Sequence, residues 1–188
     1  MASAELTKTS YTILGMLRLG QRTGYEIKQL VDVSTRFFWA ASYGQIYPEL
    51  SRLEGLGLIT GERDDSDGRR RKAYALTAEG EAALRDWLAS DDPLHFELRH
   101  EGVLKLFFAD ALDAAGRLEL LRRMRAEHER VRDQLRSMEP KVTEKREEKG
   151  SEMPLFVLRW GIEYQEFIIG WCDRMEQELA DRAAAERS

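Results

Sequence analysis

Residues 42–80 constrain the fold of this chain more than any other segment. The segment opens with an amphipathic helical pattern, because Ile46, Leu50 and Leu53 fall on one face at about 100° per residue. Glycines end this pattern, and two short strand-like runs follow, separated by the turn-forming sequence Asp-Asp-Ser-Asp-Gly. The second run begins in a basic cluster at residues 69–72. A helix followed by a basic hairpin can place one element in a DNA groove and the other on the phosphates, so the pattern predicts a winged helix-turn-helix.

Four helices and two strands are expected in the N-terminal half. The third helix contains Pro48, which cannot donate a hydrogen bond to the carbonyl of Gly44. Either its first turn is therefore irregular, or the regular helix starts nearer Ile46. Ser42 and Gln45 have the spacing of a capping box at the start of this helix. The other predicted helices are Ser10–Leu19, Gly24–Val33 and Ala78–Ala89, and the predicted strands are Leu58–Arg63 and Lys72–Leu76.

The C-terminal half is predicted to be entirely helical. The sequence Asp-Asp-Pro at residues 91–93 suggests a boundary, so we expect one domain at residues 1–90 and a second at residues 91–188. Residues 139–152 have almost no apolar content and are expected to form a mobile connector or a frayed helix end. The predicted helices are Glu97–Ala111, Ala114–Met138 and Met153–Ala185. The predicted fold class is mainly α with a small β-hairpin.

Two apolar patterns in this half favour dimerisation through a helical domain. The helix from Ala114 carries a heptad seam, and the last helix is apolar on an aromatic and on an aliphatic side, which requires two packing partners. One partner is the chain itself, and the other is expected to be a second copy. The aliphatic side contains Leu158, Ile162, Ile169 and Cys172. The predicted dimer interface contains Leu121, Met124, His128, Val131, Leu135, Phe156, Trp160 and Trp171.

Charge and cysteine content narrow the functional classes. The chain has 29 basic and 34 acidic residues, a net charge of -5, and residues 1–90 are balanced with 12 of each sign. A nucleic-acid contact must therefore depend on local clustering rather than on overall charge. A single cysteine, Cys172, excludes an intramolecular disulfide. Neither a signal peptide nor an apolar run long enough for a membrane span is recognisable, so a cytoplasmic protein without membrane partners is expected.

Catalytic and metal-binding patterns are missing from the sequence. His95 and His100 lie five residues apart, which is not the spacing of two metal ligands on one helix face. His128 falls in the heptad seam, where a polar residue more often fixes register than performs chemistry. No Gly-rich phosphate loop or nucleophile elbow is recognisable. We expect no enzyme activity, no metal site and no cofactor.

Candidate DNA contacts fall on the third helix and on the hairpin. Gln45 could pair with adenine and Arg52 with guanine. Hydroxyl groups of this region suit phosphate oxygens, and the basic cluster supplies charge to the wing. A charge run alone is more often a solvated loop, and nearby aspartates could pair with it. The full set of predicted DNA-binding residues is Ser42, Tyr43, Gln45, Tyr47, Ser51, Arg52, Arg69, Arg70, Arg71 and Lys72.

Three ordered motifs in the N-terminal half resemble those of a known family. Residues 24–28 read GYEIK, residues 44–59 read GQIYPELSRLEGLGLI, and residues 68–80 read GRRRKAYALTAEG. Together they resemble the PadR family of bacterial transcription regulators over about residues 8–90. The sequence WGIEYQEFIIGW at residues 160–171 is similar to the end of the family's longer C-terminal form. The acidic insert DDSD in the wing is longer than the family pattern.

The resemblance implies a winged-helix domain joined to a C-terminal helical dimerisation domain. It further implies a homodimeric repressor or activator whose affinity for double-stranded DNA is changed by a small molecule. Repression of a palindromic operator is the default expectation. The alternative is a helical dimeric interaction protein with a degenerate winged helix that binds protein rather than DNA.

An aromatic stripe on the last helix is the candidate effector site. A planar aromatic or lipophilic ligand could stack on these rings between two subunits. The competing interpretation is that the stripe is simply the core of a dimer. The candidate residues are Trp160, Tyr164, Phe167 and Trp171.

Overall fold

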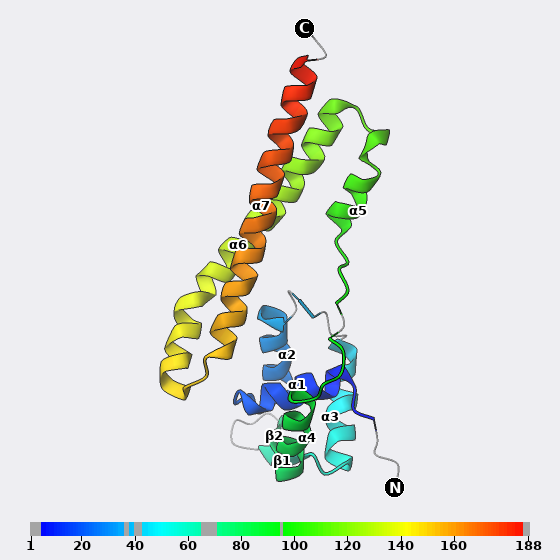
Figure 1. Cartoon of the computed structure of the whole chain (residues 1–188). Coiled ribbons are helices and arrows are strands. Elements are labelled where there is room, and N and C mark those ends of the chain that lie inside the picture. The colour runs from blue at the N-terminus through cyan, green and yellow to red at the C-terminus, as the bar shows by residue number, and fades with distance from the viewer. Residues whose placement is uncertain (1–4, 36–37, 40–42, 65–70, 95, 186–188) are drawn as a thin grey trace. The chain divides into compact units, whose positions relative to one another are not determined.

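The computed structural model describes residues 5–35, 38–39, 43–64, 71–94 and 96–185. It divides into two compact units, Met1–Leu94 and His95–Ser188, whereas the sequence-based division is placed after residue 90. Figure 1 shows the elements of each unit. In the described residues, no helix is long and apolar enough to cross a membrane.

Helix α1 (Lys8–Arg18) begins earlier than the sequence pattern suggests. Thr7 is its N-cap, and the side chains of Thr7 and Ser10 form a reciprocal capping box that fixes the start of the helix. Gly20 follows the helix with a φ of 93°, a left-handed conformation that favours glycine. Helix α1 packs against α2, α3, α4 and β2 and is thus the centre of the first unit.

Helix α2 (Gly24–Val33) is capped by Thr23, again in a capping box with Glu26. The Gly24 backbone lies close to α3: a Cβ at this position would come within 2.7 Å of a ring carbon of Tyr47. This close approach explains the glycine at the start of α2.

Helix α3 (Ile46–Gly55) is preceded by a 3-10 turn, η2 (Tyr43–Gln45). Of the two alternatives for Pro48, the later helix start is confirmed, because the α-helix starts at Ile46 and places Pro48 in its first turn, where no backbone donor is needed. Gln45 is the N-cap and makes no side-chain capping bond. The predicted capping box with Ser42 involves a residue outside the described ranges.

The hairpin and the fourth helix close the first unit. Strands β1 (Ile59–Asp64) and β2 (Arg71–Leu76) pair in antiparallel register from Ile59 opposite Leu76 to Asp64 opposite Arg71. Helix α4 (Ala78–Leu88) is capped by the Thr77 side chain. A Cβ at Gly80 would overlap the carbonyl oxygen of Leu58, so this helix start requires glycine.

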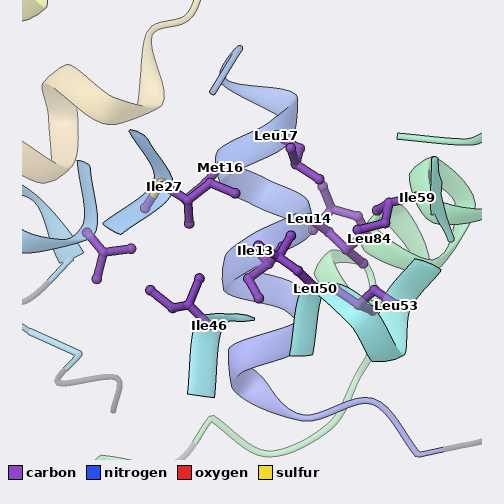
Figure 2. Close-up of a cluster of buried hydrophobic side chains, with 11 residues drawn as sticks. Ile13, Leu14, Met16, Leu17, Ile27, Ile46, Leu50, Leu53, Ile59 and Leu84 are labelled. Carbon is purple, nitrogen blue, oxygen red and sulfur yellow. The ribbon is translucent and has the colours of Figure 1, made fainter. Parts of the chain in front are cut away.

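One apolar core holds these elements together. Figure 2 shows its side chains around α1, with contributions from α2, α3, β1 and α4. The predicted buried face of α3 is confirmed, because Ile46, Leu50 and Leu53 are at most 2 % exposed. Trp87 extends the core on one side by stacking on Tyr11 with a centroid distance of 4.5 Å. The orientation of α3 is therefore determined by burial of its apolar face.

The second unit is a short helix followed by a long helical hairpin. It contains α5 (Glu101–Phe107), η3 (Ala109–Ala111), α6 (Ala114–Lys149) and α7 (Met153–Ala185). Helices α6 and α7 run side by side (Figure 1). Of the two alternatives for residues 139–152, the mobile connector is wrong for the larger part, because α6 continues through Pro140 to Lys149 and ends at Gly150 with a φ of 64°.

Contacts between the two long helices combine an apolar seam with flanking ion pairs. Leu121 and Met124 of α6 pack with Ile168 and Cys172 of α7, and Leu106 of α5 joins this cluster. The flanking pairs between α6 and α7 are Arg122–Glu176, Arg125–Asp173, Arg136–Glu166 and Glu139–Arg159. The last pair lies in the first part of the expected connector, where it supports the helical conformation.

Candidate nucleic-acid interface

Helix α3 presents a polar face to solvent opposite its buried face. Gln45, Tyr47 and Ser51 are exposed on it, with Tyr47 57 % exposed. Gly44 is exposed as well, and a Cβ added there would meet nothing within 4 Å. The Ser51 hydroxyl donates to the Tyr47 carbonyl at 3.3 Å, a bond within the helix that leaves the side of the helix unobstructed. This surface is small, polar and accessible to a partner.

Arg52 is held by protein atoms rather than directed freely into solvent. Its Nη1 donates to Glu49 Oε1 at 2.8 Å, and its Nη2 donates to the backbone carbonyl of Glu5 at 2.9 Å. The Glu49 carboxylate also accepts the hydroxyl proton of Ser10, which is completely buried. The guanidinium thus joins α3 to the residues before α1. A base contact by Arg52 would require at least one of these bonds to break.

Lys72 is also engaged within the first unit. Its ammonium donates to Glu54 Oε2 at 2.6 Å and lies 5.5 Å from the centroid of the Tyr74 ring. A Cβ on Gly61 would overlap the Lys72 side chain, so the glycine leaves space for this lysine to cross β1 toward Glu54. Burial raises the pKa of Tyr74, as does the nearby Glu54 carboxylate, while Lys72 acts in the opposite direction. Lys72 therefore links the hairpin to α3.

Several predicted contacts lie outside what the structure describes. Ser42, Arg69 and Arg70 fall in residues that are not described, and the side chains of Tyr43 and Arg71 are likewise not described. Their roles remain predictions from the sequence. The backbone of Tyr43 opens η2, and that of Arg71 opens β2.

Sequence reasoning missed two acidic residues that shape this surface. Glu49 and Glu54 hold the side chains of Arg52 and Lys72 by ion pairs of 2.8 Å and 2.6 Å. The first pair has a recognisable signal, since acidic and basic residues three apart on a helix are neighbours. The second joins residues distant in the sequence, and only the tertiary fold brings them together.

The C-terminal candidates divide into buried and exposed groups. The buried group packs within one chain between α6 and α7, while Val131 is half-buried. The exposed group lies on α7 and contains Phe156, Trp160 and Phe167, which are 53 %, 53 % and 62 % exposed. The buried group consists of Leu121, Met124, His128 and Leu135.

The predicted effector residues do not surround one described cavity. Trp160 stacks on Tyr164 with a centroid distance of 5.7 Å, and Tyr164 and Trp171 pack against the core of the hairpin. A surface hollow of about 600 Å³ lies elsewhere, lined by residues 98–101, 103–104 and 107. None of the four predicted aromatic residues lines it.

Comparison with known proteins matches each of the two units to a described protein family. The family described as the transcriptional regulator PadR-like family matches residues 13–86, and the family described as virulence activator alpha C-term matches residues 98–180. The chain belongs to the PadR-like family of transcriptional regulators. The predicted fold class is confirmed, and membership of a regulator family agrees with the expectation that the chain is not an enzyme.

Individual relatives of this PadR-like chain are regulators. The negative transcriptional regulator PadR of Bacillus subtilis (strain 168) is 38% identical over 104 residues, which are 54% of this chain and 57% of the relative. A probable transcriptional regulator of Mycobacterium tuberculosis (strain ATCC 25618 / H37Rv) is 28% identical over 174 residues, covering 85% of this chain and 91% of the relative.

Solved structures of a PadR-like relative extend the likeness to most of the chain. The Bacillus subtilis PadR in complex with operator DNA has a TM-score of 0.79 and 26% identity, covering 90% of this chain and 98% of that one. The same protein in complex with p-coumaric acid has a TM-score of 0.73 and 27% identity, covering 91% and 98%.

Proposed function

We propose that this PadR-like regulator binds double-stranded DNA through α3 and the β1–β2 hairpin. The observation that carries the proposal is the polar, accessible face of α3, which is set by complete burial of the opposite face. Such a helix fits a major groove, where base edges present a readable pattern of donors and acceptors. The similarity to a PadR structure solved with operator DNA supports this assignment.

The proposed contacts differ in kind. Gln45 reads a base, and the exposed Tyr47 and Ser51 contact bases or phosphates. The wing residues Arg69 and Arg70 contact phosphates without regard to sequence. The remaining proposed contacts with the phosphates and the groove are Ser42, Tyr43, Arg52, Arg71 and Lys72.

Arg52 and Lys72 have a second role in this proposal. Their ion pairs with Glu49 and Glu54 hold α3 against the start of α1 and against the hairpin. In this arrangement both side chains first position the reading helix. They contribute charge to DNA only after exchanging a protein partner for a phosphate.

A second copy of the chain completes the proposed regulator. The exposed rings of Phe156, Trp160 and Phe167 are an apolar surface that a partner chain can cover. A symmetric dimer presents two copies of α3, which suits a palindromic operator with half-sites about one helical turn, or a multiple of it, apart. The proposed dimer represses transcription, because a dimer bound at a promoter blocks polymerase. Its proposed location is the cytoplasm.

A small aromatic effector is part of the proposal. The exposed Trp160, stacked on Tyr164, offers a flat surface to a planar ligand in the dimer. The p-coumaric acid complex of the Bacillus relative supports an aromatic acid as the first ligand to test.

A helical interaction protein without DNA affinity is the second candidate. The ion pairs that occupy Arg52 and Lys72 favour it, as do the aspartates of the wing sequence DDSD. These ion pairs and aspartates lower the positive electrostatic potential that a DNA-binding surface needs.

Binding of the full chain to DNA from its own upstream region distinguishes the two candidates. We expect saturable binding, measured by fluorescence anisotropy, that weakens steeply with salt and exceeds binding to a scrambled duplex of equal length. Release by p-coumaric acid would support the effector. Equal, weak binding to both duplexes at low salt would overturn the DNA proposal and favour the interaction protein.

A further inference from the structure

A series of hydrogen-bonded polar side chains joins α5, α6 and α7 of the second unit, with two buried members and a half-buried histidine at one end. His100 is the N-cap of α5, His128 lies on α6 and Gln165 lies on α7. The Nε2 atoms of the two histidines are 2.8 Å apart, and His128 Nδ1 lies 2.5 Å from Gln165 Oε1. His128 and Gln165 are 9 % and 7 % exposed in an otherwise apolar seam. Buried polar groups of this kind must satisfy one another, so their proton positions are constrained.

The helix cap of α5 determines which ring nitrogens of His100 and His128 carry protons. The backbone N–H of Val103 donates to His100 Nδ1 at 3.3 Å, so this nitrogen must be unprotonated. A neutral His100 then carries its proton on Nε2 and donates it to His128 Nε2. His128 in turn carries its proton on Nδ1 and donates it to the Gln165 carbonyl oxygen. One arrangement, with both rings neutral, thus satisfies all three contacts.

An additional proton cannot enter this arrangement without breaking a bond. On His100 it would occupy Nδ1 and remove the acceptor that caps α5. On His128 it would occupy Nε2, so that two N–H groups would face each other. Burial lowers the pKa of His100, and the neighbouring His128 lowers it further. The cap at the start of α5 is therefore present only while the His100 ring is neutral.

The charged groups around the two histidines offer His100 no counterion, since no carboxylate contributes to the shift of its pKa. Glu101 pairs with Lys105 on α5, and Glu127 pairs with Arg130 on α6. Two of the flanking pairs between α6 and α7 are Arg125–Asp173 and Arg136–Glu166. The α7 group that meets His128 is the neutral amide of Gln165. Among the described residues, each of these carboxylates is engaged by its own cation, and Glu127 interacts with His128 as well. A proton on His100 is therefore poorly compensated.

The same geometry argues against a metal site. Two imidazole ligands on a tetrahedral zinc ion lie roughly 3.3 Å apart, since each Zn–N bond is about 2.0–2.1 Å. The two Nε2 atoms are closer, at a hydrogen-bonding distance of 2.8 Å. His100 also uses its Nε2 proton for that bond, because its Nδ1 is the acceptor of the helix cap.

We propose that His100, His128 and Gln165 form an acid-sensitive latch that ties the start of α5 to the α6–α7 hairpin. The latch is closed when both imidazoles are neutral and opens when His100 gains a proton. The segment that connects the first unit to the second enters α5 at His100, so opening frees this connection. The latch is a property of residues 96–185 alone and does not rest on the proposed function.

The pH window follows from the direction of the His100 pKa. Above its ordinary pKa of about 6.5, the ring is neutral in the folded and the unfolded chain. As the pH falls below that value, the unfolded chain binds the proton first, because the folded pKa is lower. The contribution of His100 to the free energy of unfolding is therefore complete above about pH 6.5 and decreases below it.

Hydrogen exchange at α5 tests the latch without DNA. In the full-length protein we expect the Val103 amide to lose about fivefold of its protection between about pH 7.5 and about pH 5.5, the size of one lost helix cap, after correction for intrinsic exchange. His100→Asn keeps a capping oxygen that does not titrate, so its protection should stay constant. His95→Gln removes the one histidine outside the latch and should show the same loss of Val103 protection as the wild type.

Two results would overturn the latch. One is constant protection of Val103 in the wild-type protein across this range. The other is an equal loss in His100→Asn, which would assign the effect to another group. Circular dichroism at neutral pH verifies that each variant is folded. If the exchange result holds while DNA is never bound, the latch stands and the proposed function fails.

Discussion

At the scale of single residues, two glycines show how backbone contacts determine which sequence is tolerated. A Cβ at Gly80 would overlap the Leu58 carbonyl oxygen, whereas a Cβ at Gly15, in the middle of α1, would meet nothing within 4 Å. Gly80→Ala should lower the free energy of unfolding by about 1–3 kcal/mol through overpacking. Gly15→Ala should raise it by about 0.5–1 kcal/mol, because alanine loses less backbone entropy in a helix. Urea denaturation of both variants measures the difference, and a stable Gly80→Ala protein would refute the close contact.

The sequence specificity of α3 is a second property of single residues. Gln45 is exposed at the N-cap of the helix and is free to turn toward a base. Gln45→Ala should leave folding unchanged and reduce discrimination at one operator position by about tenfold, within the range for one lost base contact. Competition binding against a set of single-base operator variants measures this change.

The control for Gln45 is another exposed glutamine of the same unit. Gln29 lies on α2 and donates a hydrogen bond to the Tyr25 hydroxyl at 2.9 Å. Gln29→Ala should keep the wild-type preference at every operator position. If Gln45→Ala also keeps it, Gln45 does not read a base.

At the scale of elements, the wing is expected to act through charge alone. Arg69→Ala or Arg70→Ala should weaken binding equally on operator and on unrelated DNA, and should reduce the slope of log affinity against log salt by about one. Arg174→Ala, an exposed charge on α7, should leave both quantities unchanged. A salt series by anisotropy gives the slopes, and unchanged slopes in both wing variants would remove the wing from the mechanism.

The elements themselves were largely predictable where the pattern is local. The spacing of Ile46, Leu50 and Leu53 gave the buried face of α3, and Pro48 indicated the start of the regular helix. The capping box of Thr7 with Ser10 was missed, although it is visible in the sequence, and α1 therefore begins earlier than expected. Such errors concern boundaries and leave the order of elements unchanged.

Features that depend on tertiary contacts were not predictable. Residues 139–149 are too polar to predict a buried helix, and they continue α6 in the hairpin, where Glu139 pairs with Arg159 of α7. In the same way, nothing in the sequence indicates that Lys72 crosses the glycine of β1 to reach Glu54. In both cases, charged residues that look solvated in the sequence have a partner elsewhere in the fold.

At the scale of the whole molecule, packing within one chain changes which residues can report on dimerisation. Leu135 and Trp171 belong to the predicted interface, yet Leu135 is 3 % exposed and Trp171 packs against the core of the hairpin. A charge at either position would disrupt the hairpin itself. Trp160 and Phe167 are more than half exposed, so substitutions there test the interface without burying a charge inside the chain.

Trp160→Glu and Phe167→Glu should therefore separate the proposed dimer into folded single chains. A carboxylate on each facing surface would lose its hydration and repel its counterpart in a symmetric contact. Light scattering at micromolar concentration should give twice the chain mass of 21.7 kDa for the wild type and the mass of one chain for the variants. Leu88→Glu is the matched control, because Leu88 is 70 % exposed on α4 and its replacement should preserve the dimer. A wild-type protein with the mass of one chain would refute the dimer, and variants that keep twice that mass would place its interface on another surface.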